Sequence, residues 1–269
     1  MTENKERKIL FFDIDGTLIT DDGKRMFPES AKCAIKSARQ NGHLAFINTG
    51  RTFENVDDFI RSAGFDGYVC GCGTYIVVDD KELYHHKLTR ERCVEIALLA
   101  RKCKLQAIFE HAKRTCYDKE CPIKEADDLI DYFKEMGRTL VSDITDEAFV
   151  FDKFTAWYKN GVTDMETFVK GLPDFTFIER EGSFWEAVPK GFSKATGIKY
   201  LLDYYKIPIE NAYVFGDSNN DLEMLQYVPN SIAMGVCSPE VKAIASYRTA
   251  RVEEDGIRKA MEHFGIINS

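Results

Sequence analysis

Short apolar runs alternate with helix-like segments in the first and last parts of the chain. The first run is Ile9-Leu10-Phe11-Phe12, and uniformly apolar runs of this length are typical of strands buried on both faces. The strands expected are 8–12, 44–47, 68–70, 212–215 and 231–234, and the helices are 30–41, 52–63, 193–205, 220–227, 239–245 and 255–264. This alternation predicts an α/β fold, with a doubly wound, Rossmann-like parallel sheet as its core.

A different pattern occupies the middle of the chain. Tyr75 to Val78 followed by Asp79-Asp80 predicts a hairpin, and an α+β module begins near Tyr84. It comprises expected helices at 89–102, 126–136 and 163–170 and expected strands at 105–109, 154–158 and 175–179. A length of 269 residues also favours a core with an inserted module over a single compact unit. We therefore expect a core formed by 1–83 and 186–269, with 84–185 inserted.

Two carboxylates directly follow the first apolar run. Asp13 and Asp15 are two positions apart, so an extended chain places both on one side, followed by Gly16. In open α/β folds the carboxyl edge of the sheet is where ligands bind. Two carboxylates this close repel each other unless a cation or a proton intervenes, and Mg²⁺ prefers such oxygen ligands. The alternative is a turn that closes the strand and uses Gly16 only for its backbone freedom.

Three further polar segments also lie near strand ends or helix starts. Thr49-Gly50-Arg51 follows the second strand, and Arg51 offers a bidentate fork for a phosphate. Gly216 to Asp221 follows the strand at 212–215 and supplies more oxygen ligands. A helix that begins near Ser193 places Lys194 in its first turn, where a lysine neutralises a phosphoryl group. Together these segments indicate a site for phosphate chemistry.

In this order, Asp13 to Thr17, Thr49, Lys194 and Gly216 to Asp221 resemble the motifs of the haloacid dehalogenase superfamily of phosphohydrolases. The Thr49-Gly50-Arg51 segment, the long insertion and the later Lys-Gly-x-x-Lys pattern are similar to its Cof-type class IIB branch. That branch dephosphorylates sugar phosphates and related small metabolites, and its insert is a cap that closes over the strand ends. One departure is Gly71-Cys72-Gly73-Thr74, where the branch commonly has Asn-Gly-Ala.

The resemblance implies a role for each of these residues. Asp13 would be the nucleophile that forms an aspartyl phosphate, and Asp15 the general acid and then base. Thr49, the Gly50 amide and Lys194 would bind the phosphoryl group. Asp13, the Asp15 carbonyl and Asp217 would hold Mg²⁺, the expected cofactor.

Three assignments leave an alternative open. Asp221 orients Lys194 or a water on the metal, or it is only an acidic residue favoured at a helix start. Asn220 contacts the phosphate or caps the helix. Arg51 binds phosphate or is solvated. In the cap, Glu110, Arg114, Tyr117, Trp157 and Trp185 have no supporting motif and are not assigned to the site.

Composition narrows the possible partners. A net charge of −8 argues against a nucleic-acid footprint, which needs clustered Lys and Arg. No stretch is long and apolar enough for a membrane span, and Met1 to Lys8 is too polar for a signal peptide, so we expect a cytoplasmic protein. The spacing of the eight cysteines favours reduced thiols over a zinc site, and His85-His86 suggests a solvated linker pair. The sequence does not define an oligomeric state.

The expected activity is Mg²⁺-dependent hydrolysis of small phosphorylated metabolites, most naturally sugar phosphates. Two alternatives remain at this point. A sugar phosphomutase would use the same aspartyl phosphate but return the phosphoryl group to sugar. A regulator that binds phosphorylated metabolites without turnover would not need both Asp13 and Asp15.

Overall fold

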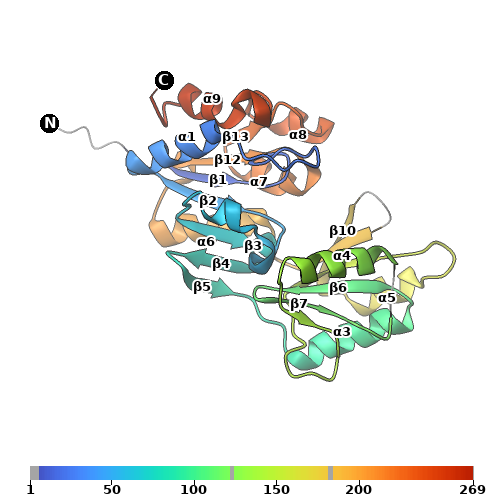
Figure 1. The fold of residues 1–269 in the computed structure, drawn as a ribbon. Coiled ribbons are helices and arrows are strands. Elements are labelled where there is room, and N and C mark those ends of the chain that lie inside the picture. The colour runs from blue at the N-terminus through green and yellow to red at the C-terminus, as the bar shows by residue number, and fades with distance from the viewer. Residues whose placement is uncertain (1–5, 122–123, 181–183, 269) are drawn as a thin grey trace. The chain divides into compact units, whose positions relative to one another are not determined.

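The computed structural model describes residues 6–121, 124–180 and 184–268. The chain divides into two compact units. The first unit consists of the chain up to Arg51, Val56–Tyr84 and the chain from Ser193 onward, and the second consists of Thr52–Asn55 and His85–Phe192. Figure 1 shows the fold of each.

The first unit is built on a largely parallel sheet. Among the described residues its strands run in the order β14 (Tyr247–Arg248), β13 (Asn230–Ala233), β12 (Ala212–Gly216), β1 (Ile9–Phe12), β2 (Leu44–Asn48), β3 (Gly67–Cys70), β4 (Tyr75–Val78) and β5 (Lys81–His85). The first six are parallel, and β4 turns back antiparallel to β3. β1 therefore lies at the centre of the sheet. The residues that directly follow β1 lie at the middle of the sheet's carboxyl edge.

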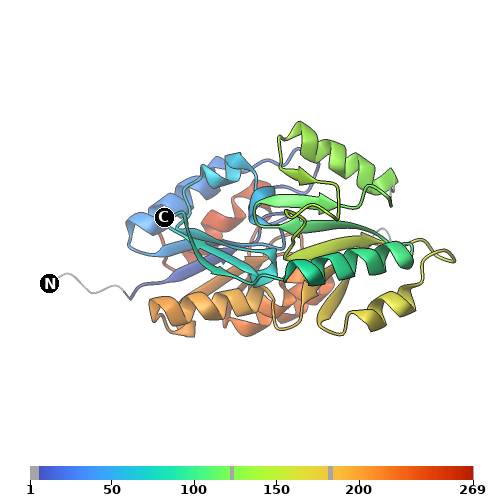
Figure 2. The same ribbon diagram turned by 90° about the horizontal axis from the view of Figure 1, so that it is seen from below.

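Helices cover both faces of this sheet, as Figures 1 and 2 show for α1 and α6. The helices of this unit are α1 (Glu29–Gln40), α2 (Asp58–Arg61), α6 (Lys194–Tyr205), α7 (Leu222–Tyr227), α8 (Pro239–Ile244) and α9 (Gly256–His263). Ile9 and Phe11 pack with Ile198 and Leu201 of α6, while Leu10 and Phe12 are fully buried as well. Burial on both faces explains why these strands lack polar alternation.

The second unit is an α+β module. In the described ranges its sheet has the order β10 (Phe175–Arg180), β11 (Phe184–Pro189), β9 (Lys153–Trp157), β6 (Gln106–His111), β7 (Arg114–Tyr117) and β8 (Leu140–Val141). Its helices are α3 (Arg90–Lys102), α4 (Lys124–Glu135) and α5 (Met165–Gly171). Cys93 and Ile96 of α3 share a core with Phe154 and with Phe168 of α5. Ile130 and Phe133 of α4 pack with Ile108 of β6. The fold class expected from the sequence is confirmed.

Several expected elements differ in the structure. The helix expected over 52–63 is divided into a 3₁₀ turn, η1 (Phe53–Asn55), and the short α2. The backbone N–H of Glu54 donates to the Ala112 carbonyl, and the Asn55 amide to Glu110, so contacts within the second unit compete with helix propagation. Between β1 and α1, Asp21 to Lys24 form bends, and an isolated bridge joins Asp15 to Ile19.

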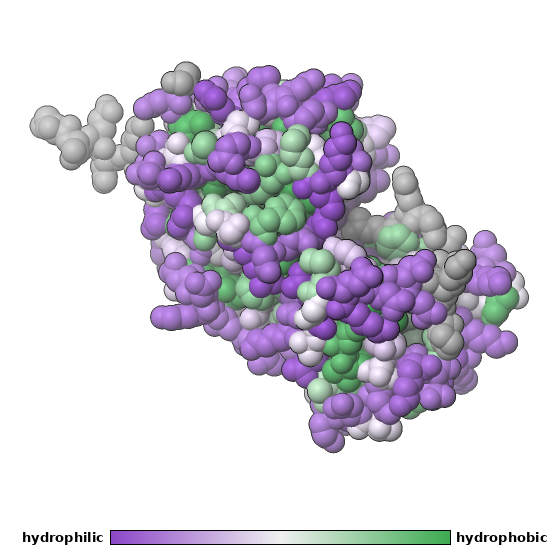
Figure 3. Space-filling view, in the orientation of Figure 1, coloured by the Kyte–Doolittle hydropathy of each residue, from purple (hydrophilic) through white to green (hydrophobic). Residues whose placement is uncertain are grey.

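Surface hydropathy is consistent with the composition. On the face shown in Figure 3, hydrophilic residues predominate and hydrophobic ones occur in separate groups. None of the helices in the described part of the chain combines the length and apolar character needed to cross a membrane.

Candidate active site

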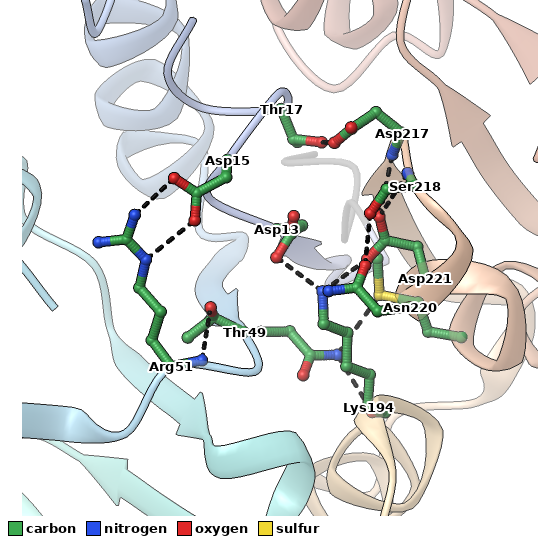
Figure 4. A network of polar contacts seen from close by, with 12 residues as sticks. Asp13, Asp15, Thr17, Thr49, Arg51, Lys194, Asp217, Ser218, Asn220 and Asp221 are labelled. Atoms are coloured by element: carbon green, nitrogen blue, oxygen red, sulfur yellow. Dashed lines mark hydrogen bonds and ion pairs between the residues drawn. The ribbon is translucent and has the colours of Figure 1, made fainter. Parts of the chain in front are cut away.

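The carboxyl edge of the first unit's sheet gathers Asp13, Thr49, Lys194 and Asp217 (Figure 4). Asp13 follows β1, and its backbone N–H continues the ladder by donating to the Phe215 carbonyl over 3.1 Å. The strand register therefore fixes Asp13 beside the end of β12, and Asp217 directly follows that strand. The side chain of Asp13 is buried.

Lys194 connects the two acidic strand ends. Its Nζ donates to Asp13 Oδ1 and to Asp221 Oδ1, each over 2.6 Å. It is the first residue of α6, which begins with a capping box between Ser193 and Thr196. Asn48 adds a further tether by donating its side-chain amide to the Lys194 carbonyl over 3.1 Å. These contacts fix the backbone around Lys194. Its buried ammonium group therefore reaches Asp13, the nucleophile predicted from the sequence.

Asp221 is held from both sides. Its Oδ2 accepts the backbone N–H groups of Asp217 and Ser218 at 3.0 and 3.1 Å, while Oδ1 accepts from Lys194. These bonds close the turn η4 (Asn219–Asp221) that follows β12. Gly216 is needed for this turn because a Cβ there would overlap the Asp221 carboxylate. Both oxygens of Asp221 are engaged, so its carboxylate positions Lys194 rather than presenting a free ligand.

Burial dominates the electrostatics of this cluster. Burial, opposed by Lys194, raises the pKa of Asp13 to about 7. Burial and the charges of Asp13 and Asp221 raise the pKa of Asp217 to about 8. Burial opposes the charge of Lys194, but the two carboxylates outweigh it and raise the lysine pKa. Three carboxylates around one lysine leave excess negative charge that a cation would offset.

The donor set fits a hard divalent cation. Oxygens of Asp13, Asp217 and Asp221 lie within 4.8 Å of one another. Thr17 Oγ1 donates to Asp217 Oδ1 over 2.8 Å, and Lys194 Nζ donates to Asp13 Oδ1. Within the described residues, Oδ2 of Asp13 and Oδ2 of Asp217 accept no hydrogen bond. Carboxylate oxygens with free lone pairs are what Mg²⁺ requires. The residues therefore fit the expected metal.

The phosphate-binding candidates lie around the same edge. Thr49 is buried after β2, and its Oγ1 accepts the backbone N–H of Arg51 over 3.1 Å. Gly50 lies between them in the chain. Asn220 accepts a hydrogen bond from the Ser218 hydroxyl at 2.6 Å.

Arg51 makes its main contacts with carboxylates. Its Nε and Nη2 bind Asp15 Oδ2 and Oδ1 at 2.9 and 2.5 Å, and its Nη1 binds Asp57 Oδ2 at 2.8 Å. Figure 4 shows this fork on Asp15, on the side of Asp13 away from Asp217. Burial opposes the charge on Arg51, but Asp15 and Asp57 outweigh it and raise the pKa of the guanidinium.

Sequence reasoning gave no role to several residues that build this site. Thr17 supports Asp217, Asn48 tethers Lys194, and Asp57 holds Arg51. Thr17 lay within the motif already recognised, and Asn48 directly precedes Thr49, so both positions carried a usable signal. Asp57 carried none, because it lies outside the motifs and its contacts with Arg25 and Arg51 depend on side-chain directions that no sequence pattern specifies.

The turn that departs from the family pattern supports the same site. Gly71–Gly73 forms the 3₁₀ turn η2, with Cys72 at a positive φ of 55°. Gly73 faces the start of α6, and a Cβ there would lie 2.5 Å from the Ser193 carbonyl oxygen. The substituted segment thus still packs closely against the helix that carries Lys194.

A second titratable cluster lies in the second unit. The expectation of a solvated histidine pair at His85-His86 is wrong for His85, whose side chain is only 3% exposed and binds Asp152 Oδ1 through Nε2 over 2.7 Å. The His111 ring lies 5.3 Å from that of His85. His111 Nδ1 accepts the backbone N–H of Lys113, which leaves the proton of the neutral ring on Nε2. This tautomer offers no lone pair at Nε2, so the cluster is a hydrogen-bonded network rather than a prepared metal site.

The other aromatic and charged residues that the sequence singles out in the second unit make contacts within that unit. Glu110 accepts from Thr155 Oγ1 at 3.0 Å, and Arg114 donates to the Ala148 carbonyl. Trp157 stacks on Phe184, and Trp185 packs against Phe177. All eight cysteines are free thiols.

A doubly wound sheet whose carboxyl edge carries a buried lysine among three carboxylates defines an enzyme of phosphoryl transfer. A family model described as haloacid dehalogenase-like hydrolase matches residues 10–261. The chain therefore belongs to the haloacid dehalogenase-like hydrolase family.

Individual relatives agree with this assignment. The chain is 28% identical over 275 residues to "Putative phosphatase YkrA" of Bacillus subtilis strain 168, covering 97% of this chain and 99% of the relative. A hypothetical protein from Geobacillus kaustophilus HTA426 has a solved structure with a TM-score of 0.83 and 28% identity, covering 97% of this chain and all of that one. BT4131, described as a subclass IIB sugar phosphatase, gives a TM-score of 0.79 at 28% identity over 97% of this chain and 100% of its own. This protein is thus a phosphatase of the haloacid dehalogenase type.

Proposed function

We propose that this phosphatase is a Mg²⁺-dependent phosphomonoester hydrolase that acts on small phosphorylated metabolites through an aspartyl phosphate on Asp13. The observation that carries the proposal is the placement of Asp13 at the end of the central strand, bound to Lys194 and beside Asp217. A buried carboxylate is an efficient nucleophile towards phosphorus only where its negative charge and that of the phosphate are neutralised.

The reaction would proceed by two displacements. An oxygen of Asp13 forms a bond to phosphorus as the bond to the alcohol oxygen breaks, and Asp15 gives its proton to the departing alkoxide. Asp15 then accepts a proton from water, whose oxygen attacks phosphorus and releases Asp13 and inorganic phosphate. Dividing hydrolysis in this way replaces one difficult step with two easier ones.

Asp13, Asp217 and the Asp15 backbone carbonyl would hold the Mg²⁺ ion. When bound, the ion supplies positive charge that neutralises the phosphoryl oxygens and the two carboxylates. Asp221 acts on the reaction through Lys194, since both of its oxygens are engaged in holding that lysine and the turn before it.

The phosphoryl group would be bound by the Thr49 hydroxyl, the Gly50 backbone N–H and Lys194, with Asn220 as a further contact. Thr49 Oγ1 accepts a hydrogen bond from the backbone N–H of Arg51. The hydroxyl proton of Thr49 therefore points elsewhere and is available to a phosphate oxygen. Arg51 contributes positive charge from the side of Asp15.

Sugar phosphates are the proposed substrate class, with the inserted second unit as the cap that selects the leaving group. The similarity to the subclass IIB sugar phosphatase BT4131 supports this choice. A net charge of −8 is also unfavourable for binding polyanionic nucleic acid, which leaves small phosphate esters as the better partners.

The test is phosphate release from a panel of sugar, nucleotide and cofactor phosphates, with and without Mg²⁺. We expect sugar phosphates to rank first, EDTA to abolish release reversibly, and Asp13→Asn to fall below about a hundredth of wild type because an amide cannot form the acyl phosphate. Substantial release by Asp13→Asn would contradict the covalent mechanism. Transfer of label between sugar positions without free phosphate would instead identify a mutase.

A further inference from the structure

Asp57 is a buried carboxylate in an unusual position. It is the residue before the first turn of α2, where aspartate normally accepts a backbone N–H of the helix, yet its side chain makes no such bond. The side chain is only 6% exposed, and it meets two guanidinium groups, those of Arg25 and Arg51. A carboxylate buried in this way is stable only if it is paired. Its pairing partners therefore indicate what it does.

Arg51 bridges Asp57 and Asp15. Nη1 binds Asp57 Oδ2 at 2.8 Å, and the opposite edge, Nε and Nη2, grips the Asp15 carboxylate at 2.9 and 2.5 Å. The guanidinium is planar and rigid, so fixing one nitrogen at Asp57 fixes the direction in which the fork meets Asp15. Asp15 is itself 48% exposed on its side chain and thus depends on Arg51 for a defined orientation.

Arg25 reaches the same carboxylate from the loop that follows Thr20. Its backbone has a positive φ of 51°, a left-handed conformation that costs about 1 kcal/mol for a non-glycine residue. Hydrogen bonds from Thr20 Oγ1 to Asp22 and from the Met26 N–H to Thr20 Oγ1 close this loop. Asp57 therefore has two separable contacts, one to the loop and one to the Arg51 fork.

We propose that Asp57 is a positioning residue for Asp15, holding the Arg51 guanidinium in the orientation that sets the Asp15 carboxyl group against the reacting oxygen. The proposal rests on the proposed function of Asp15 as the acid and base of a phosphatase. Arg25 anchors the loop to Asp57 and takes no part in this positioning. Asp57 touches neither substrate nor metal and acts only through Arg51.

The experiment compares phenyl phosphate with p-nitrophenyl phosphate, two probes that differ by one nitro group and in how much their leaving group needs a proton. Asp57→Asn should lower kcat about tenfold on phenyl phosphate but less than about threefold on p-nitrophenyl phosphate, with KM little changed. Asp58→Asn, the exposed neighbour, is the matched control and should leave both rates at the wild-type level. A rise in KM with unchanged kcat would overturn the proposal, because it would assign Arg51 to binding phosphate.

A double-mutant cycle separates positioning from general stabilisation. In an Arg51→Gln background, Asp57→Asn should have almost no further effect, because the group through which it acts is gone. Additive losses would overturn the proposal. Arg25→Gln should keep the wild-type ratio between the two probes, and reproduction of the Asp57→Asn ratio would show that Asp57 acts through the loop instead.

Two further measurements keep the outcome interpretable. If Asp57→Asn fails to fold, Asp57→Glu is the substitute, because it retains the charge but displaces the Arg51 fork. Its kcat should fall more on phenyl phosphate than on p-nitrophenyl phosphate. A wild-type ratio between the two probes would reject the positioning role. Asp15→Asn is measured in parallel. Equal losses for Asp15→Asn on both probes would mean that the proposed acid role fails, whereas a selective Asp15 loss without a selective Asp57 loss rejects only the positioning.

Discussion

In the proposed mechanism, the two aspartates after β1 carry different parts of the reaction, and substrates with different leaving groups distinguish their roles. Asp15→Asn removes a proton donor but leaves the Asp13 nucleophile and Lys194 in place. We expect a loss of about 10² to 10⁴ in kcat on alkyl phosphates and a much smaller loss on p-nitrophenyl phosphate, whose leaving group scarcely needs protonation. Steady-state kinetics on both substrates measures this. Equal losses would mean that another group protonates the leaving oxygen in the first step.

Gly16 offers a second residue-level prediction. It has a φ of +77°, and a Cβ at this position would overlap the Asp217 carboxylate. Gly16→Ala should therefore displace Asp217, the proposed metal ligand, and raise the half-saturating Mg²⁺ concentration about tenfold or more, as loss of supporting contacts at metal sites does. The measurement is a Mg²⁺ titration of phosphate release.

Gly42→Ala is the matched control for that substitution. Gly42 has a similar φ of +89° but no atom within 4 Å of the added carbon, so the variant carries the backbone strain without the collision. It should lose stability by about 1 kcal/mol and keep the wild-type response to Mg²⁺. If both variants changed the metal response alike, the effect of Gly16→Ala would come from strain elsewhere.

Residues in continuous motifs could be placed from the sequence, whereas their long-range partners could not. Asp13, Lys194 and Asp217 follow a strand or open a helix, so local pattern alone brings them to one edge of the sheet. The Arg51 bridge between Asp15 and Asp57 depends on side-chain directions that no periodicity specifies. Similarly, His85 looked solvated because its partner Asp152 is far away in the sequence.

Elements were predictable where burial and local signals agree. The central strands are apolar throughout, and β1, β2 and β12 occur where the pattern indicates. The helix expected over 52–63 failed because tertiary contacts of Glu54 and Asn55 override its local preference. Strand β7 was missed because it is short and carries polar residues such as Arg114, and β8 was missed because it is only 2 residues long.

His111, the last residue of β6, should make the stability of the protein sensitive to acid. Burial, with a smaller opposing effect from Asp152, lowers the pKa of His111 to about 4. The unfolded chain has an ordinary histidine pKa near 6.5, so between about pH 6.5 and 4 it binds more protons than the folded chain. The free energy of unfolding should therefore fall as the pH drops through this window.

His111→Asn tests that dependence while keeping an acceptor for the Lys113 N–H. The variant should lose less stability between pH 7 and pH 5 than wild type, as measured by urea unfolding at each pH. His263→Asn, at an exposed position, serves as the control and should retain the wild-type difference. An unchanged pH dependence in His111→Asn would exclude His111 as its source.

For the whole molecule, the sequence indicated an α+β module inserted into an α/β core, because the pattern of apolar residues changes near Tyr84. The sequence did not show that Thr52–Asn55, which directly follows Arg51, belongs with the second unit. These residues join it through the Glu54 N–H and the Asn55 amide, which bind Ala112 and Glu110. The chain thus enters the second unit twice, once directly after Arg51 and once at His85, where the long insertion begins.

If the second unit is the cap that selects substrates, specificity should be transferable separately from chemistry. We propose exchanging Thr52–Asn55 and His85–Phe192 for the corresponding segments of YkrA, the 28%-identical Bacillus subtilis relative. The ranking of sugar phosphates by kcat/KM should then follow the donor of the exchanged segments, because binding energy remote from phosphorus positions the reacting group. Hydrolysis of p-nitrophenyl phosphate should persist in the chimera and be lost on adding Asp13→Asn.

A control chimera with only Thr52–Asn55 exchanged shows how much of the change in substrate ranking those residues cause. If the full chimera kept this enzyme's own ranking, recognition would instead lie in the first unit, with Arg51 and the loops at the sheet edge.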